Sequence, residues 1–481
     1  MKIRFSVIML MALSTMQGAR GATYHVAPAG SDAHPGTAQQ PWLSLQHAAE
    51  QVHAGDRVLM HGGIYSLKER VQLKKSGTPN AWITIAAAPG EKPILDASGV
   101  RPANGGEAGW FGAVTIEGPS YLRLVNLGVR NSYFAGIMVR GPSHHIDLAG
   151  CTVDMTFAPG IGAWNGTDLR VIGCEVTNAN TQKMRLFGDP QQECPHEAIS
   201  IAGVNRFEAA WNHVHHCEKE GIDVKEVSRN GVVHHNFIHD MPRQGLYTDA
   251  WFGVLENVEF ASNVVQDCEW GLVISVEGRD SQLRSVRVHH NLLYRNRASG
   301  IYFGTWGENG LRSDIRIENN TLYANGAPQH WAGPTGNIDV RASNVRDLLV
   351  ARNICAAGGA YEIATFLNPA TEAARFEELK MRIDDNVVAS NKDETNGPPG
   401  YGKPFVWPGT HTIVADPQFM SPAKGNFRPR AGSPAFSTSS YRGAFAPGAH
   451  KLPAIQGKLS GFPFFEPSTP RTKEWPEFLR P

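Results

Sequence analysis

The sequence predicts an all-β solenoid, a parallel β-helix of about ten coils. The 481 residues include 50 Gly and 31 Pro. Together these make up about 17% of the chain, against an average of about 12%, and such an excess is typical of many short strands joined by turns. An apolar strand pattern that ends in Asn or Cys recurs at intervals from 23 residues (Cys151 to Cys174) to 38 residues (Cys174 to Asn212). A second pattern, a small residue followed by alternating apolar residues, lies between its copies. Repeats of this length with two or more short strands predict stacked coils.

The N-terminal residues predict export. Lys2 and Arg4 precede an apolar run that begins at Phe5, and Ala19 and Gly21 stand at the positions that a signal peptidase requires. We therefore expect residues 1–21 to be a signal peptide and the mature chain to be secreted or periplasmic. The later sequence has no apolar stretch of about 18 residues, so no membrane anchor is expected.

The predicted solenoid begins with a cap. Residues 42–52 have the pattern of an amphipathic helix, with Ser44 as its N-cap. Such a helix would cover the open end of the coil stack, because an exposed end of a repeat protein must be capped. The first coil is expected to begin at Ala54.

The recurring Asn predicts an inward ladder in which each amide bonds the next coil. Cys151 and Cys174 occupy the same repeat position, so we expect stacked thiols there rather than a bond between them. One or two disulfides among the six Cys remain an alternative for an exported chain. The repeat positions are Cys151, Cys174, Asn212, Asn236, Asn263, Asn291, Asn320, Asn353 and Asn386.

The end of the chain is predicted to close the solenoid. Residues 371–382 are expected to form a short helix, and residues 416–434 an edge-capping segment. Residues 22–440 would then form one β-helix domain with its N-terminal cap. The Pro- and Gly-rich residues 441–481 are expected to be a tail packed on its side.

Alternation along the second strand of each coil assigns side chains to two faces. Ile222 and Val224 are expected inside, with Asp223 and Lys225 outside. Stacking the coils by their small first residue aligns three outward columns. The first is Met138, Gly162, Ser200, Asp223, Tyr247, Val273, Tyr302 and Asp339. The second is Arg140, Trp164, Ala202, Lys225, Asp249, Ser275, Gly304 and Arg341, and the third is Val227, Trp251, Glu277, Trp306 and Ser343.

These columns predict a surface that binds a polysaccharide or oligosaccharide. Three adjacent coils carry Lys225, Asp249 and Glu277 among aromatic residues. Aromatic rings stack on the apolar faces of sugars, while charged and amide groups bond the hydroxyls. Longer turns at 305–313 and 325–336 are expected to carry specificity. The expected substrate-binding residues are Asp223, Tyr247, Trp251, Tyr302, Trp306, Arg243, Asp339 and Arg341.

A carboxylate pair predicts a glycoside hydrolase. Glu277 lies between Trp251 and Trp306 in its column, and apolar walls raise a carboxyl pKa, which suits a general acid. Asp249 lies beside Lys225, whose charge is expected to keep it ionised as nucleophile or base. The alternative is a cross-strand ion pair beside a rim glutamate. The two backbone positions are about 8 Å apart by strand geometry, which favours inversion of configuration.

Three further segments carry a family resemblance. The opening Tyr24-His-Val-Ala-Pro-Ala-Gly-Ser-Asp, the turn Ala54-Gly-Asp-Arg-Val with Gly63-Ile-Tyr, and the closing Asp416-Pro-Gln-Phe resemble exported right-handed parallel β-helix proteins of the pectate-lyase-like superfamily. The resemblance implies a right-handed solenoid and work on carbohydrate. It leaves the reaction open, because the superfamily holds lyases, hydrolases, epimerases and binding proteins.

The resemblance also implies two alternatives to a hydrolase. A polysaccharide lyase would use Lys225 as base and Arg243 or Arg341 to neutralise a uronate. Glu220–Tyr247 is similar to the calcium-site region of one pectate lyase family, but most acidic ligands are replaced, and the position of the family's lysine base reads Val273. Ca²⁺ is therefore expected only for a lyase, and otherwise no cofactor. The other alternative is a non-catalytic carbohydrate-binding or surface protein.

The charge balance and the histidine pattern indicate which other partners are expected. The 45 basic and 45 acidic residues balance, which disfavours nucleic acid, and we expect a monomer. Eight histidines lie beside the Asn ladder, and their recurrence favours stacked imidazoles over a metal site. They are His213, His215, His216, His234, His235, His239, His289 and His290.

Overall fold

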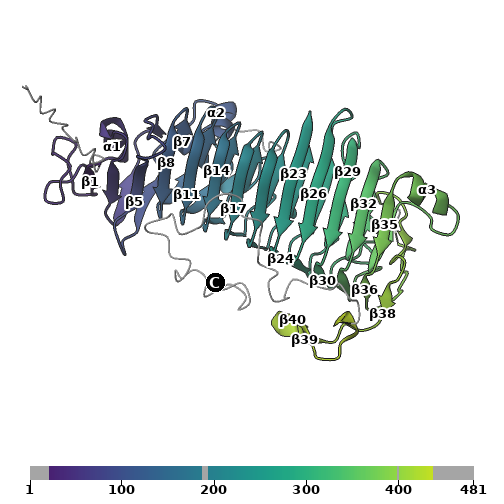
Figure 1. Ribbon diagram of the computed structural model, residues 1–481. Coiled ribbons are helices and arrows are strands. Elements are labelled where there is room, and N and C mark those ends of the chain that lie inside the picture. The colour runs from purple at the N-terminus through teal and green to yellow at the C-terminus, as the bar shows by residue number, and fades with distance from the viewer. Residues whose placement is uncertain (1–20, 187–192, 398–399, 437–481) are drawn as a thin grey trace, which may run out of the picture.

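The computed structural model describes residues 21–186, 193–397 and 400–436, and these form a long solenoid of stacked coils (Figure 1). Three sheets of 13, 12 and 13 strands run along it, and a two-stranded sheet follows. The predicted count of about ten coils is close, and the added strands come from both ends of the described residues. The predicted signal peptide and the tail at 441–481 lie outside the described residues.

Sheet A contains the strands that lead into the recurring Asn or Cys. All adjacent strands of this sheet pair in parallel. For example, Phe260 pairs with Val233 on one side and with Val288 on the other. Its strands are β1 (Thr23–Val26), β2 (Arg57–Met60), β5 (Ile83–Ala87), β8 (Ser120–Val125), β11 (His144–Ala149), β14 (Thr167–Ile172), β17 (Asn205–Ala210), β20 (Arg229–His234), β23 (Val254–Ala261), β26 (Gln282–His289), β29 (Leu311–Glu318), β32 (Val345–Ala351) and β35 (Met381–Asp384).

Sheet B contains the short strands that follow the recurring residue. The sequence patterns did not predict these strands as a separate set. They are β3 (Gly63–Ser66), β6 (Pro93–Asp96), β9 (Gly128–Ser132), β12 (Thr152–Thr156), β15 (Glu175–Thr177), β18 (His213–His215), β21 (Phe237–His239), β24 (Val264–Gln266), β27 (Leu292–Tyr294), β30 (Thr321–Tyr323), β33 (Ile354–Ala356), β36 (Val387–Val388) and β38 (Ile413–Val414).

Sheet C contains the predicted second strand of each coil. Its strands are β4 (Val71–Leu73), β7 (Gly112–Glu117), β10 (Ala135–Arg140), β13 (Ile161–Trp164), β16 (Ile199–Ala202), β19 (Ile222–Lys225), β22 (Gln244–Ala250), β25 (Trp270–Val276), β28 (Ile301–Phe303), β31 (Ile338–Val340), β34 (Ile363–Thr365) and β37 (Phe405–Val406). The last of these, β37, runs antiparallel to β34.

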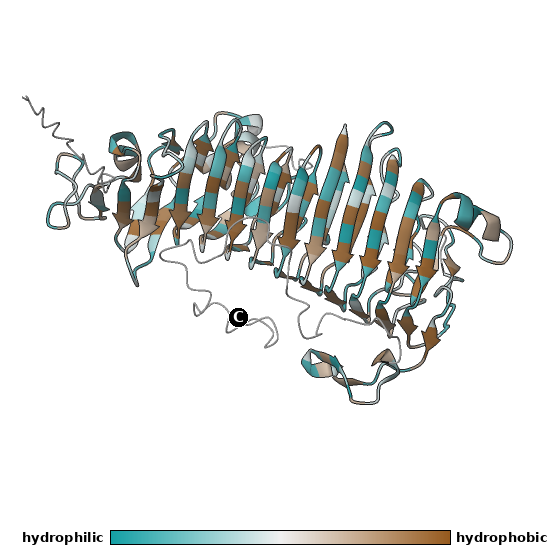
Figure 2. Cartoon of the chain, viewed as in Figure 1, coloured by the Kyte–Doolittle hydropathy of each residue, from teal (hydrophilic) through white to brown (hydrophobic). Residues whose placement is uncertain are grey.

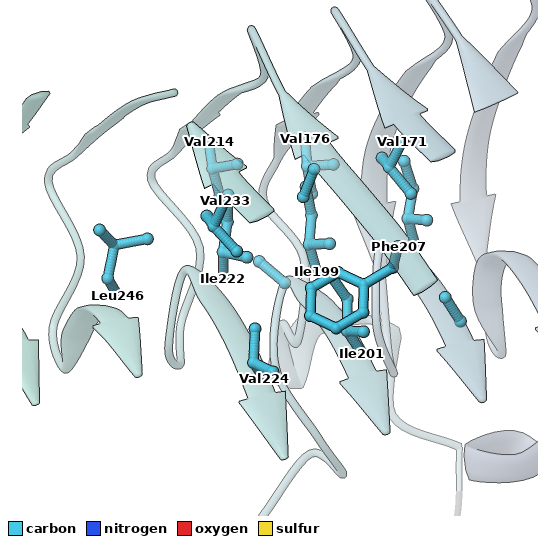
Figure 3. Close-up of a cluster of buried hydrophobic side chains, with 14 of the residues drawn as sticks. Val171, Val176, Ile199, Ile201, Phe207, Val214, Ile222, Val224, Val233 and Leu246 are labelled. Carbon is cyan, nitrogen blue, oxygen red and sulfur yellow. The ribbon is translucent and has the colours of Figure 1, made fainter. Parts of the chain in front are cut away.

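The alternation of side chains is confirmed. Ile199, Ile222 and Val224 point into the solenoid and lie among side chains from the other sheets (Figure 3). Because apolar burial is the dominant favourable contribution to folding, this core fixes which residues of each strand face outward. The strands alternate between apolar and polar residues along their length (Figure 2).

The predicted Asn ladder is also confirmed. The Asn236 amide donates to Asn263 Oδ1 at 2.9 Å, and the Asn263 amide donates to Asn291 Oδ1 at 3.0 Å. The residue before each ladder Asn turns the chain from sheet A to sheet B with a left-handed backbone, at φ 52° for His235 and 55° for Ser262. A second ladder of Asn296, Asn325 and Asn337 was not predicted.

Both ends of the solenoid have the expected helices. Helix α1 (Leu45–Gln51) begins at the predicted N-cap, where the Ser44 side chain accepts from His47 N. Helix α3 (Ala373–Glu378) lies within the predicted range, and α2 (Gly105–Trp110) was not predicted. Short 3₁₀ turns are Gln182–Met184, Pro422–Lys424 and Pro434–Phe436, and β39 (Phe419–Ser421) pairs with β40 (Asn426–Pro429).

The cysteines are buried thiols. Cys151 and Cys174 stack in successive coils, as predicted, and their Sγ atoms donate to backbone carbonyl oxygens of Leu124 (3.7 Å) and Leu148 (3.6 Å). All six cysteines carry thiols, so the alternative of one or two disulfides is wrong for this structure. Among the described residues, no helix is both long and apolar enough to cross a membrane.

Candidate active site

The strand register of sheet C aligns the first predicted column, and the second as far as Ser275. Lys225 pairs with Asp249, and Asp249 with Ser275. The register of six successive strands therefore brings charged residues that are distant in sequence onto one outer face. The first column runs through Ser200, Asp223, Tyr247, Val273, Tyr302 and Asp339.

Most of this face is covered rather than open. Asp223, Tyr302 and Asp339 are 0% exposed, whereas Trp251 is 53% exposed. Residues from the predicted long turns fold over the sheet, and Trp306 Nε1 donates to the hydroxyl of Tyr401 at 3.0 Å. The expectation that the whole first column lines an open surface is therefore wrong, because the sequence repeat does not show where long turns fold.

Lys225 is the centre of a buried charged cluster. Its Nζ lies 3.0 Å from Glu197 Oε1, 3.7 Å from Asp223 Oδ2 and 3.9 Å from Asp249 Oδ2. Burial alone would lower the pKa of Lys225, but its acidic neighbours, Glu197 first, raise it above its ordinary value. The ammonium is consequently held in its charged form and makes a poor base.

The carboxyls around Lys225 differ in their ionisation. Burial pushes the pKa of Glu197 upward, but Lys225 and His196 bring it down to about 2. Burial first, and then the charge of Glu197, raise the pKa of Asp223 well above its ordinary value. Glu197 therefore neutralises Lys225, and the pKa shift of Asp223 favours its protonated form.

The environment of Asp249 favours its protonated form. Burial, followed by the charge of Glu277, raises its pKa to about 8, and Lys225 offsets only part of that rise. The indole Nε1 of Trp251 donates to Asp249 Oδ2 at 3.0 Å, while Asp249 Oδ1 has no hydrogen-bond partner. The expectation that Lys225 keeps Asp249 ionised is therefore wrong. A proton on Oδ1 at neutral pH makes Asp249 the better candidate for a general acid.

Glu277 lies at the more open edge of this cluster, just beyond the end of β25. The hydroxyl of Tyr247 donates to Glu277 Oε1, and Ser275 Oγ lies 3.4 Å from the same oxygen. These contacts fix one oxygen of the carboxylate towards the sheet. Glu277 is partly exposed, so it is the member of the pair that solvent reaches directly.

The residues at the calcium-site positions do not fit a calcium ion. Arg243 Nη1 donates to Glu220 Oε1 at 2.9 Å, and Arg243 also lies 3.4 Å from Glu193. A guanidinium placed against the carboxylate supplies the positive charge that Ca²⁺ would bring, and it offers no oxygen ligand. Val273, at the position of the family's lysine base, is an apolar residue that is 0% exposed.

Three predicted binding residues belong to a closed network instead. Asp339 and Arg341 form a buried ion pair at 2.7 Å, and Tyr361 bonds to both. Tyr302 is buried beside Trp270, with ring centroids 4.4 Å apart. The polar atoms of the pair are committed to each other and to backbone oxygens, so we assign Asp339 and Arg341 to the support of the turns above them.

Glu197 was missed by the sequence patterns. It contacts Lys225 and also accepts a hydrogen bond from Ser200 Oγ at 2.7 Å. A signal was present, because Glu197-Ala-Ile repeats the spacing of Glu220-Gly-Ile one coil later. The long insertion before Glu197 obscured that match.

Two family models match parts of the chain. The family model described as "Pel9A-like, right handed beta helix region" matches residues 24–185, and the model described as "Right handed beta helix region" matches residues 112–284. The first match ends before Glu197 and the rest of the cluster. It therefore describes the first coils and not the candidate active site.

Two curated proteins are similar to parts of the chain. Pectate lyase PEL9 of Emericella nidulans is 39% identical over 75 residues, which cover 16% of this chain and 18% of that protein. Uncharacterized protein YwoF of Bacillus subtilis is 23% identical over 318 residues, which cover 59% of this chain and 64% of that protein. The chain therefore spans less than two thirds of either relative.

A solved structure shows the same fold. The crystal structure of pectate lyase Pel9A superposes with a TM-score of 0.50 at 13% identity, covering 86% of this chain and 91% of that one. Both named enzymes among these relatives are pectate lyases. The chain is a right-handed parallel β-helix protein that matches the Pel9A-like model in its first coils and the general right-handed β-helix model over residues 112–284.

Proposed function

We propose that the protein is a glycoside hydrolase that cleaves a polysaccharide or oligosaccharide, with Asp249 as general acid and Glu277 as base or nucleophile. The observation that carries the proposal is Asp249, a buried carboxyl with a pKa of about 8 and an unbonded Oδ1. It lies one coil away from Glu277. Two carboxyls whose environments differ in this way match the division of labour in glycosidases.

The two carboxyls divide the chemistry of hydrolysis. Asp249 Oδ1 would donate its proton to the glycosidic oxygen as the bond to the sugar breaks. Glu277 would either take a proton from the attacking water or attack the sugar itself. Trp251, which is bonded to Asp249 and half exposed, would stack against a sugar ring beside the acid.

Export of a monomeric enzyme remains part of this proposal. A secreted or periplasmic location is supported by the signal-peptide pattern of residues 1–21. The substrate would then be an extracellular or periplasmic carbohydrate, and the balanced charge disfavours nucleic acid as a partner.

A polysaccharide lyase is the second candidate, and the Pel9A-like match over residues 24–185 favours it. A lyase base must be neutral to accept a proton. Lys225 is charged, and its Nζ lies 3.0 Å from the ionised Glu197, which argues against that role. Arg243 could neutralise a uronate only by leaving Glu220.

Substitution of the carboxyls tests the proposed roles. On a substrate identified from a panel of neutral and uronate-containing polysaccharides, Asp249→Asn and Glu277→Gln should each lower kcat by about 10²–10⁴-fold. The exposed Glu308→Gln serves as a matched control and should keep the wild-type rate. Near-wild-type kcat in both site variants, with loss only in Lys225→Ala, would favour the lyase.

A further inference from the structure

Three histidines on sheet B come together on the outside of the solenoid. His213 and His215 belong to β18, and His239 belongs to β21 in the next coil. His215 pairs with His239 in the strand register, and their rings stack with centroids 5.0 Å apart. This cluster belongs to a different sheet from the carboxylates of the candidate active site, and the proposed function does not use it.

The nitrogens of these rings converge. His213 Nε2 lies 2.8 Å from His239 Nε2, and each of the three side chains offers a nitrogen within 4.8 Å of the other two. The buried Nε2 of His215 has no hydrogen-bond partner among the described residues. Ligands of tetrahedral zinc at about 2.0–2.1 Å from the metal lie about 3.3 Å apart, so small side-chain rotations would suffice.

Two carboxylates complete the arrangement. Glu175 Oε1, one coil earlier, lies 3.8 Å from His213 Nδ1 and 3.5 Å from His215 Nε2. Asp240 Oδ2 lies 2.7 Å from His239 Nδ1. A carboxylate that accepts the proton of one ring nitrogen leaves the lone pair on the other, which is the outer-shell arrangement common at metal-binding histidines.

We propose that His213, His215 and His239 bind one divalent transition-metal ion such as Zn²⁺, with Glu175 as the fourth ligand. Imidazole and carboxylate ligands suit zinc. The ion would tie three consecutive coils together as a structural clamp.

Another histidine pair of the chain shows a contact between two rings without a third ligand. His289 and His290 lie in adjacent positions, with their Nδ1 atoms 2.7 Å apart, and Glu259 accepts from His289 at 2.8 Å. Neither belongs to a group of three ligating side chains among the residues that the structure describes. The rings of His289 and His290 are perpendicular rather than stacked, whereas the expected stacking is found for His215 and His239. The cluster at β18 and β21 has, in addition, the composition of a metal site.

Zinc binding to the metal-free full-length protein, without a histidine tag, tests this proposal. Isothermal titration should give one tight Zn²⁺ per chain, and Zn²⁺, unlike Ca²⁺, should raise the Tm. His213→Ala and His239→Ala should weaken binding at least about 100-fold, and the control His289→Ala should keep wild-type affinity. Asp240→Asn, which keeps all three rings, should weaken binding about 10–100-fold and decides the matter if an alanine variant fails to fold.

Two results would overturn the proposal. One is the absence of saturable Zn²⁺ binding to the wild-type protein. The other is binding that His239→Ala and Asp240→Asn leave unchanged, since the ion would then lie elsewhere, for example at Asp384, Asp385 and His411.

Discussion

At the scale of single residues, Asp249 shows how burial can outweigh a neighbouring charge. Its carboxyl lies 3.9 Å from the ammonium of Lys225, a contact that by itself would favour ionisation. Glu197 lies 3.0 Å from Lys225, and its negative charge offsets part of the effect of Lys225 on the pKa of Asp249. The desolvated carboxyl therefore keeps its proton to about pH 8.

This protonation predicts the pH dependence of turnover. If Asp249 donates a proton, kcat should fall on the alkaline side with an apparent pKa near 8. A pH–rate profile of the wild-type protein measures that limb, and the residual activity of Asp249→Asn should lack it. An alkaline limb that persists in the variant would assign it to another group.

The same group predicts a pH-dependent change in stability. Because the folded state binds the Asp249 proton more tightly than the unfolded state, its contribution to stability is complete below the ordinary Asp pKa and is lost as the pH rises towards 8. Asp249→Asn never ionises, so its free energy of unfolding should exceed that of the wild type by about 1–3 kcal/mol at pH 9.

Denaturation by urea at pH 4 and pH 9 measures this difference. The gain should shrink at pH 4, where the wild-type carboxyl is protonated in the folded protein. The exposed Asp280→Asn is the control and should shift stability by less than about 0.5 kcal/mol at both pH values. An equal effect of Asp249→Asn at the two pH values would mean that its pKa is not raised.

Residue identities and spacing could predict which side chains face outward in adjacent coils, but not their ionisation. Lys225, Asp249 and Glu277 were placed in adjacent coils by alternation alone. The state of each group depends on Glu197 and on how deeply it is buried, and the linear sequence records neither. The expected inversion of configuration stays a prediction, since it depends on the distance between the carboxyl groups of Asp249 and Glu277 during the reaction.

At the scale of elements, the Asn ladder holds the turn between sheets A and B. Each ladder amide donates to a backbone carbonyl of the preceding coil and to the next amide, as Asn263 does with Val233 O at 2.9 Å and Asn291 Oδ1 at 3.0 Å. The ladder satisfies polar groups that would otherwise be buried without partners. It thereby supports a left-handed residue, such as Ser262, in each turn.

Removing one amide should therefore be costly. Asn263→Ala would leave the main-chain and side-chain donors of Asn236 without their acceptor, and should lower the free energy of unfolding by about 3–4 kcal/mol. Asn205→Ala, outside the ladder, should cost less than about 0.5 kcal/mol. Chemical denaturation measures both, and similar losses in the two variants would contradict the role of the ladder.

The elements were predictable where the sequence repeats and unpredictable where it does not. The strands of sheets A and C, helix α1 and the first ladder follow from recurring residues such as Asn263 and from the Ser44 cap. Sheet B has strands of only two or three residues after β12, too short to show an alternation. The turns that bury Tyr302 and Asp339 are insertions without a period.

At the scale of the whole molecule, the solenoid is a common support for the two proposed sites, which lie on different sheets. Sheet C presents Asp249 and Glu277, while sheet B presents the histidine cluster around His239. Each site combines residues from successive coils, so the stacking of coils fixes both geometries. Helix α1 packs against β1 and β4 at one end, and β37 extends sheet C antiparallel to β34 at the other.

The central claim is that the carboxylate pair hydrolyses a glycosidic bond. The most direct measurement follows one reaction of the active substrate with two readouts, new reducing ends and the ultraviolet absorbance of an unsaturated uronate. The proposal predicts reducing ends without that absorbance, and loss of both the product and its pH 8 limb in Asp249→Asn. Unsaturated products formed in proportion to cleavage would contradict it and identify the protein as a lyase.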